Sequence, residues 1–356
     1  MYLDNAATTR VDYEILTKTL PCFLEDYGNP SSRHRMGYKA KELIEEARAK
    51  VAMSINADPE QIFFFSSATE ANNYVLNLYP RIACSPWEHS SVEKKFVTGY
   101  SHFDLFSHML VNNETGDLFD IKMLCESYHK DNTLFHTDAT QAFGKVPIDV
   151  KDLNVDFLTF SGHKIHSLKG CGVLYVKDPS ALPEKNTCLV GGEQEKGIHP
   201  GTENVPAIVA MGYACEKYNY DEDKDYLMNR LYDKIILKLR DSGLDYRINR
   251  IELLHVPNII NISFKDVDGE TLQDMLSQQL IYVSTSSACT SGIKKSRVLS
   301  AMGVPDDYIY GSIRLSFSYA DIDDPKYELR ILNNIDRIIE TVNKALQIAR
   351  LLKGVE

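Results

Sequence analysis

Short apolar runs in the first half of the chain end in polar residues and alternate with helical patterns. These runs occupy positions 61–66, 105–111, 133–136, 156–160 and 172–176. Continuous apolar runs of this length are typical of buried strands in a mostly parallel sheet. In such sheets the polar residues just after the strands line the ligand crevice. The pattern therefore predicts an α/β fold whose chemistry lies at the strand ends.

The last third of the chain has a different pattern. Residues 258–264, 281–284 and 312–317 have the composition of strands. A helical periodicity with one apolar face then extends over about 326–353. This mixture predicts a smaller α+β domain beside the larger one.

The expected boundary between the two domains lies near residue 240. It follows an acidic, polar segment at 220–224 and the helical pattern after it. We expect a large cofactor-binding domain at 15–240. The small domain is expected to combine residues 1–14 with residues 241–356.

Composition and charge narrow the class of protein. The formal net charge of −11 argues against nucleic-acid binding, which favours a basic face. No apolar run approaches the roughly 20 residues of a membrane span, and the N-terminus has no basic and apolar leader pattern. The seven cysteines include no C-x-x-C pair, so neither a disulfide framework nor a metal site is predicted. A cytoplasmic protein with no membrane or nucleic-acid partner is expected.

A lysine and an aspartate follow two of the predicted strands. Lys164 comes after the run at 156–160, and Asp138 comes after the run at 133–136. Desolvation in a crevice lowers the pKa of a lysine and lets it form a Schiff base. Pyridoxal phosphate acts as an electron sink only while its ring nitrogen is protonated, and a nearby carboxylate maintains that state. Taken alone, each residue also fits a plainer interpretation, a surface lysine and a helix N-cap.

A third feature suits a phosphate group. Ser66-Ser67-Ala68-Thr69 lies where a predicted strand gives way to a helix. Backbone N–H groups, hydroxyls and the positive end of the helix dipole would converge there on an anion. A capping box explains the same residues, and the two interpretations are compatible.

Many further motifs occur in one order along the chain. They are Tyr2-Leu3-Asp4-Asn5-Ala6-Ala7-Thr8-Thr9, Gly28-Asn29-Pro30-Ser31-Ser32, Ala68-Thr69-Glu70-Ala71-Asn72-Asn73, Glu88-His89, Asn112-Asn113-Glu114-Thr115-Gly116, positions 136–141 and 161–164, Gly201-Thr202-Glu203-Asn204-Val205-Pro206, and Ser287-Ala288-Cys289-Thr290-Ser291. Together they resemble NifS/IscS-type cysteine desulfurases of the class V aminotransferase family, over nearly the whole chain. The resemblance implies a fold-type I, aspartate-aminotransferase-like enzyme that binds pyridoxal 5'-phosphate and acts as a homodimer.

The resemblance also implies a role for each matching residue. Lys164 would hold the cofactor, Asp138 would contact the ring nitrogen, and His89 would stack on the ring and move protons. Gln141 and Asn113 would bond the ring oxygen or the substrate. The implied phosphate ligands are Ala68 through its backbone, Thr69, Ser161, His163 and, from the other subunit, Thr202.

Cys289 is implied to be the nucleophile that receives the sulfur as a persulfide. It lies in the small, polar stretch 283–292, where a cysteine is more exposed than in an apolar run, and only the thiolate attacks. The alternative is a small buried residue, as most free cysteines are. We accept that alternative for the other six cysteines.

The chain departs from the family pattern near the substrate. Tyr319 stands where the family has an arginine for the substrate carboxylate, and a phenol offers one neutral donor instead of a charged fork. Tyr319 is therefore the expected ligand of an altered site, to which Arg33 or Arg35 could add a charge. A second arginine is missing before Gly201, and the usual Gly-Pro is missing after Lys164.

The stretches from Thr69 to His89 and from His89 to Asn113 are also short for the family. They predict the loss of a peripheral strand–helix unit, which leaves a sheet edge to be covered by a loop or by the dimer partner.

The leading interpretation is conversion of L-cysteine to L-alanine, with the persulfide of Cys289 passed to an acceptor protein, as in iron–sulfur cluster assembly or another pathway. Two alternatives stay open. One is a related class V reaction, on selenocysteine or cysteine sulfinate or of aminotransferase type. The other is a degenerate cofactor-binding partner in a sulfur-trafficking complex.

Overall fold

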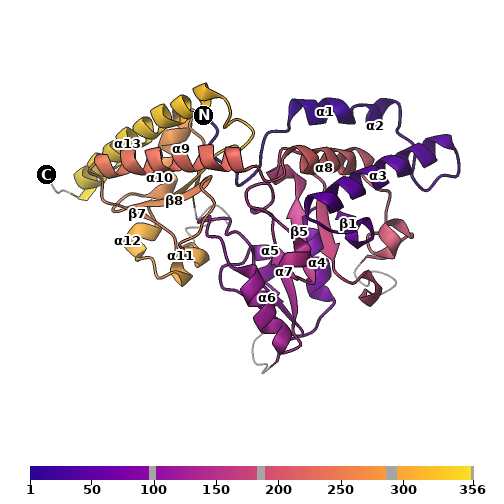
Figure 1. Ribbon diagram of the computed structural model, residues 1–356. Helices are drawn as coiled ribbons and strands as arrows, with labels where there is room; N and C mark the ends of the chain where they lie inside the picture. The colour runs from indigo at the N-terminus through magenta and orange to yellow at the C-terminus, as the bar shows by residue number, and fades with distance from the viewer. Residues whose placement is uncertain (96–101, 183–188, 286–294, 354–356) are drawn as a thin grey trace. The chain divides into compact units, whose positions relative to one another are not determined.

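The chain is divided into two compact units in the computed structural model, which describes residues 1–95, 102–182, 189–285 and 295–353 (Figure 1). Unit 1 comprises Met1–Thr8, Asn112–Leu118 and Asp221–Glu356. Unit 2 comprises Thr9–Val111 and Phe119–Tyr220. By its contacts the helix after residue 221 belongs to unit 1, whereas the sequence pattern placed the boundary after that helix, near residue 240.

Unit 2 contains a sheet with the strand order β1-β6-β5-β4-β3-β2. The strands β2 to β5 are parallel to one another, and β6 is antiparallel to both of its neighbours, β1 and β5. The strands are β1 (Ile62–Phe65), β2 (Ile82–Cys84), β3 (Leu105–Ser107), β4 (Leu134–Asp138), β5 (Phe157–Ser161) and β6 (Gly172–Val176). The predicted mostly parallel α/β fold is confirmed. The three-residue strand β2 is too short to have given a pattern of its own.

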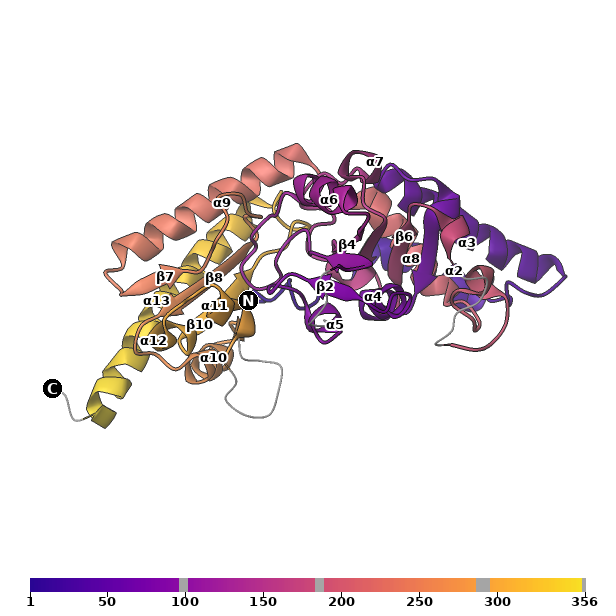
Figure 2. The same cartoon turned by 90° about the horizontal axis from the view of Figure 1, so that it is seen from below.

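The longer helices of unit 2 pack on this sheet and on one another. Helix α3 packs along α8, α6 packs on β4, and α4 packs on β5 and β6 (Figure 2). Gly212 permits the contact of α3 with α8, because a Cβ there would lie 2.7 Å from the Cα of Ala47. The helices are α1 (Tyr13–Thr19), α2 (Pro21–Leu24), α3 (Arg35–Ser54), α4 (Ala68–Asn77), α5 (Ser90–Glu93), α6 (Ile121–Lys130), α7 (Val150–Leu153) and α8 (Val205–Lys217).

Unit 1 contains an antiparallel sheet with the strand order β7-β8-β10-β9. Its strands are β7 (Tyr246–Ile248), β8 (Ile259–Phe264), β9 (Ser284–Thr285) and β10 (Ser312–Ser316). Its helices are α9 (Glu222–Asp241), α10 (Gly269–Gln278), α11 (Arg297–Ala301), α12 (Asp306–Ile309) and α13 (Pro325–Lys353). The strand pattern at 281–284 thus yields only the two-residue β9, while the predicted helix at 326–353 matches α13 closely.

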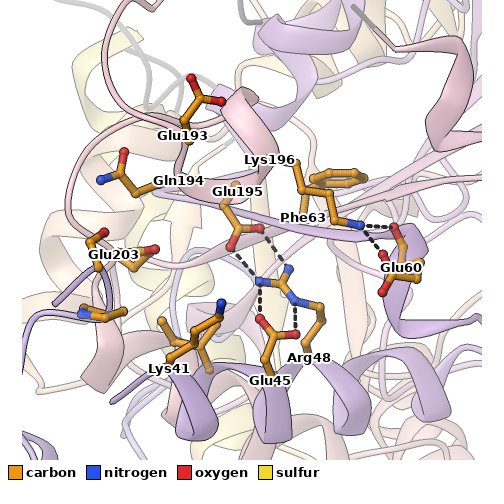
Figure 3. A pocket seen from close by; sticks show the side chains of 13 residues that line it. Lys41, Glu45, Arg48, Glu60, Phe63, Glu193, Gln194, Glu195, Lys196 and Glu203 are labelled. Atoms are coloured by element: carbon orange, nitrogen blue, oxygen red, sulfur yellow. Dashed lines mark hydrogen bonds and ion pairs between the residues drawn. The ribbon is translucent and has the colours of Figure 1, made fainter. Parts of the chain in front are cut away.

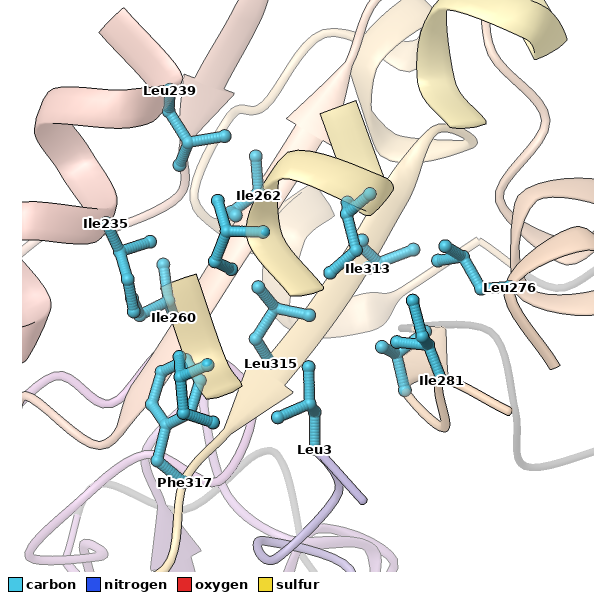
Figure 4. Packing of buried hydrophobic residues seen from close by; sticks show 14 of the residues in the cluster. Leu3, Ile235, Leu239, Ile260, Ile262, Leu276, Ile281, Ile313, Leu315 and Phe317 are labelled. Carbon is cyan, nitrogen blue, oxygen red and sulfur yellow. The ribbon is translucent and has the colours of Figure 1, made fainter. Parts of the chain in front are cut away.

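The core of unit 1 follows from alternation along β8 and β10. Ile260 and Ile262 of β8, with Ile313 and Leu315 of β10, are buried among the helices (Figure 4). The residues between them on β8 and β10 are polar, and period two places them on the opposite face of the sheet. One of them, Arg314, bonds the segment at 112–118 of the same unit.

None of the described helices is both long enough and apolar enough to cross a bilayer.

Candidate active site

The ends of β4 and β5 bring Asp138 and Lys164 to the same edge of the sheet in unit 2. The two strands are parallel neighbours, and Asp138 lies opposite Thr159. Asp138 is the last residue of β4, and Lys164 ends the short 3-10 helix Gly162–Lys164 that follows β5 directly. Parallel register therefore produces the juxtaposition that the strand pattern predicted.

The carboxylate of Asp138 is buried and bonded only to neutral donors. Its side chain is 5% exposed. Oδ1 accepts from the backbone N–H of Thr140 at 2.9 Å, and Oδ2 accepts from Nδ2 of Asn72 at 2.8 Å. Among the described residues no cation bonds to it, and the hydroxyl of Thr140 beside it is buried without a partner. A buried carboxylate in these surroundings favours a cationic N–H donor as ligand.

The start of α4 forms a cradle for an anion. Ser67 caps the helix by accepting from the N–H of Glu70 at 3.2 Å. In the described part of the chain no acceptor bonds the N–H groups of Ala68 and Thr69, and Thr69 is exposed. Gly172 of β6 passes close by, and a Cβ there would lie 2.5 Å from the nitrogen of Ala68. The donors of a helix N-terminus and an exposed hydroxyl suit a phosphate group.

A second lysine lies beneath the site. Lys145 is 8% exposed, and its Nζ donates to the backbone oxygen of Gln141 at 2.9 Å and to Oε1 of Gln141 at 3.3 Å. Burial and, secondly, the charge of Lys164 lower the pKa of Lys145 to about 7. The contact with Lys145 fixes the orientation of the Gln141 amide, with Oε1 toward Lys145.

The residues around Lys164 are held by the start of the chain. The backbone oxygen of His163 accepts from the N–H of Thr9 at 2.9 Å and from its hydroxyl at 3.0 Å. Burial, followed by the charges of Lys164 and Lys169, lowers the pKa of His163 to about 4. His163 is therefore neutral at physiological pH. Ser161, at the end of β5, is buried.

His89 lies at the start of the short helix α5, where it is the N-cap residue. Its ring is exposed, and Nδ1 lies 2.8 Å from the hydroxyl oxygen of Ser91. Thr202 is exposed in the segment that leads to α8.

Asn113 and Tyr319 belong to unit 1, whereas Lys164 belongs to unit 2. The backbone oxygen of Asn113 accepts from Nη1 of Arg314 at 2.7 Å. The hydroxyl of Tyr319 donates to Oδ1 of Asp225 at 3.1 Å, and its side chain is buried. Cys289 lies outside the described residues.

A separate pocket of about 370 Å³ lies in unit 2 between α3 and the segment 193–203 (Figure 3). Its floor is a buried ion pair in which two nitrogens of Arg48 bond the two oxygens of Glu195 at 2.7 and 2.9 Å. The same groups bond the outer edge of β1, since Glu195 accepts from the N–H of Phe64 and Arg48 donates to the oxygen of Ile62. This pair therefore covers the open edge of the sheet.

The comparisons with known proteins agree with this architecture. The family described as Aminotransferase class-V matches residues 1–93 and 97–324. The chain belongs to this family. As a class V member, it is 34% identical to the cysteine desulfurase IscS of Methanosarcina thermophila, over 98% of this chain and 92% of that protein. It is 36% identical to the cysteine desulfurase IscS of Pseudoalteromonas translucida, over 96% of this chain and 94% of that protein.

Solved structures match over most of the chain as well. A NifS-like protein has a TM-score of 0.84 and 32% identity, covering 96% of this chain and 99% of that one. SspA in complex with cysteine has a TM-score of 0.72 and 27% identity, covering 89% of this chain and 98% of that one. The resemblance to NifS/IscS-type cysteine desulfurases is thereby confirmed.

Sequence reasoning missed several buried polar residues of the site. Asn72 follows Thr69 by one helical turn, so it lies on the same face of α4. This spacing could have predicted that Asn72 faces the site. Thr159 and His136 are polar residues within apolar strand runs, which is weaker evidence for a place in the site. Ser91 and Lys145 gave no signal, because only the folded chain shows what they contact.

Proposed function

We propose that the chain is a pyridoxal-phosphate-dependent cysteine desulfurase. It converts L-cysteine to L-alanine and passes the sulfur to an acceptor protein as a persulfide on Cys289. The observation that carries the proposal is the buried carboxylate of Asp138, which bonds no cation among the described residues and lies at the same end of the sheet as Lys164. Full-length similarity to proteins named cysteine desulfurase, and to one solved with cysteine, supports the choice of substrate.

The described residues fit the cofactor group by group. Lys164 would hold it covalently, Asp138 would accept from its ring nitrogen, and Ala68 and Thr69 would bind its phosphate with Ser161 and His163. When bound, pyridoxal phosphate supplies an electron sink for the amino-acid substrate. The NH2 group of Gln141 would donate to the ring oxygen.

The chain's own groups would handle protons and sulfur. His89 would exchange protons beside the ring. The thiolate of Cys289 would attack the sulfur of the substrate and form an S–S bond. The carbon–sulfur bond of the substrate breaks, its electron pair stays with the substrate carbon, and that carbon takes up a proton to give alanine.

A homodimer and an acceptor protein complete the proposal. Thr202 would reach the cofactor phosphate of the second subunit, which is consistent with its exposed position. Tyr319 stays the predicted neighbour of the substrate carboxylate, although its hydroxyl proton is already donated to Asp225. Arg33 and Arg35 are exposed, and they stay the predicted candidates for the missing charge.

The test is incubation of the purified protein with L-cysteine, measuring alanine and sulfide together. Wild type should form both and carry a borohydride-reducible adduct, and Lys164→Ala should lose the adduct while keeping its fold. Cys289→Ser should keep the adduct and form no sulfide, and mass spectrometry should find the persulfide on Cys289. Alanine without persulfide would favour another class V reaction, and an adduct without turnover would favour a binding role.

A further inference from the structure

Asn72 lies beneath the proposed cofactor site with its amide fully enclosed. Its side chain is 0% exposed. The amide oxygen accepts from the hydroxyl of Thr159 at 2.5 Å. The amide nitrogen donates to Oδ2 of Asp138 at 2.8 Å and to the hydroxyl oxygen of Ser91 at 3.0 Å. A carboxylate only accepts, so the end of the amide that faces Asp138 must be the NH2 group.

This orientation dictates the direction of the next hydrogen bond. Ser91 accepts from Asn72, so its own proton is available to Nδ1 of His89, 2.8 Å away. The backbone N–H of Ser91 also points to Nδ1, at 3.2 Å. A backbone N–H only donates, so Nδ1 of His89 is an acceptor. The proton of the neutral imidazole therefore lies on Nε2.

We infer that Asn72 is a positioning residue which, with Ser91, joins the carboxylate of Asp138 and the imidazole of His89 in one hydrogen-bonded unit and fixes His89 as the Nε2–H tautomer. The inference rests on the proposed function, which places these two side chains at the ring nitrogen and over the ring of one cofactor. It means that resting His89 presents a proton donor at Nε2, so that its first proton exchange is a donation.

The substitution Asn72→Asp tests the donor–acceptor direction of the hydrogen bonds in this unit, because aspartate has almost the same volume as asparagine. An aspartate at 72 accepts where the NH2 group donated, so the hydroxyl of Ser91 turns its proton away from His89. The shorter contact, 2.8 Å between Nδ1 of His89 and this hydroxyl oxygen, then favours a proton on Nδ1. The backbone N–H of Ser91, at 3.2 Å, still opposes it, so the two tautomers compete where wild type holds one. The new carboxylate also faces Asp138, and two carboxylates that share a site hold one proton between them.

The first measurement uses the cofactor-free protein with ¹⁵N-labelled histidine, in which loss of a signal in His89→Gln assigns His89. Wild type should show the Nε2–H tautomer, whereas Asn72→Asp should move a measurable fraction of His89 to Nδ1–H or to the protonated ring. Ser91→Ala should give a mixture in which Nε2–H still leads, because the backbone N–H of residue 91 remains. The controls are Asn77→Asp, at the exposed end of α4, and Ser90→Ala, at the exposed start of α5, and both should match wild type. An unchanged Nε2–H signal in Asn72→Asp and Ser91→Ala would overturn the inference.

The second measurement uses the loaded enzyme with L-cysteine. Loss of a hydrogen bond to a charged or reacting group should lower kcat about tenfold or more in Asn72→Asp, with a much smaller change in KM and a shifted absorption spectrum of the bound cofactor. Ser91→Ala removes only a hydroxyl and serves as the decisive variant if Asn72→Asp folds poorly, since kcat equal to that of Ser90→Ala would contradict the proposed role. The histidine spectrum is read without cofactor, so it stands even if cysteine proves not to be the substrate.

Discussion

Two buried polar clusters of unit 2 differ in how their charges are balanced. The cluster beside the edge strand β1 contains Arg48 and Glu195, which are joined by two short bonds. Both side chains also bond the backbone of β1. The cluster under the site holds one carboxylate, Asp138, among the neutral groups of Asn72 and Thr140. In the first cluster the positive charge of Arg48 balances the negative charge of Glu195, and the pair stabilises the edge strand of the sheet. In the second cluster the negative charge of Asp138 has no bonded counter-charge among the described residues. A buried charge without a counter-charge is typical of a binding site.

The largest expected effect follows from breaking the balanced cluster. Arg48→Ala leaves the carboxylate of Glu195 buried without its partner, which typically costs about 3–5 kcal/mol of stability. Lys39→Ala, in the same helix, breaks an exposed pair with Glu42 and should cost at most about 1 kcal/mol. Denaturant unfolding of both variants measures the difference. Equal losses would mean that the Arg48 pair contributes no more than a surface pair.

In the cluster around Asp138, a substitution should lower the catalytic rate more than the stability. Asp138→Asn keeps the shape and the bond to the N–H of Thr140, but its NH2 group then faces the NH2 group of Asn72. One buried donor loses its acceptor, so stability should fall by about 1–3 kcal/mol, less than for Arg48→Ala. The variant loses the charge for the ring nitrogen, so kcat for L-cysteine should fall about a hundredfold or more, equivalent to about 2.7 kcal/mol. Unfolding and turnover are measured on the same preparation. A large loss of stability with normal turnover would assign Asp138 to the structure instead.

Lys145 sharpens the comparison, because it is a buried cation without a carboxylate partner in the described residues. Its pKa is lowered from 10.5 to about 7, so the folded state disfavours its protonated form. The unfolded chain then binds more protons between about pH 7 and 10.5, and this group makes stability rise with pH in that window. Lys145→Met should remove this contribution and be more stable than wild type by about 1–2 kcal/mol at pH 6. Unfolding at pH 6 and pH 9 for both proteins provides the check, and identical pH dependence would show that Lys145 keeps its charge in the fold.

The smallest effect is expected at a half-exposed carboxylate of unit 1. Asp225 accepts from Tyr319 and Asn229, and burial raises its pKa despite these bonds. Tyr319→Phe removes one hydrogen bond and should cost about 1 kcal/mol of stability. The substrate role predicted for Tyr319 adds a second expectation, a loss of kcat/KM for L-cysteine relative to Tyr319→Arg, which restores a charged fork. Steady-state rates of the two variants decide that point.

The pair of Asp138 and Lys164 was predictable from the chain, because two apolar runs each ended in a functional side chain and parallel strands end at one edge. The start of α4 was predictable from its capping residues for the same local reason. The link from Asn72 through Ser91 to His89 was not, since it depends on which polar groups the fold encloses together. Glu195 shows the same limit, because its buried carboxylate bonds a strand edge that no local pattern identifies.

Unit 1 is assembled from segments that lie far apart along the chain. Ala6 bonds the side chain of Ser316 across 310 residues, and Met1 bonds Leu280 across 279. At a synthesis rate of about 5–20 residues per second, the first residues wait roughly 15–60 s on the ribosome for these partners. Residues 62–176, which contain every strand of the unit 2 sheet, are by then already made. We therefore expect unit 2 to fold during synthesis and unit 1 to close late, once β10 and α13 have been made and can pack with the start of the chain.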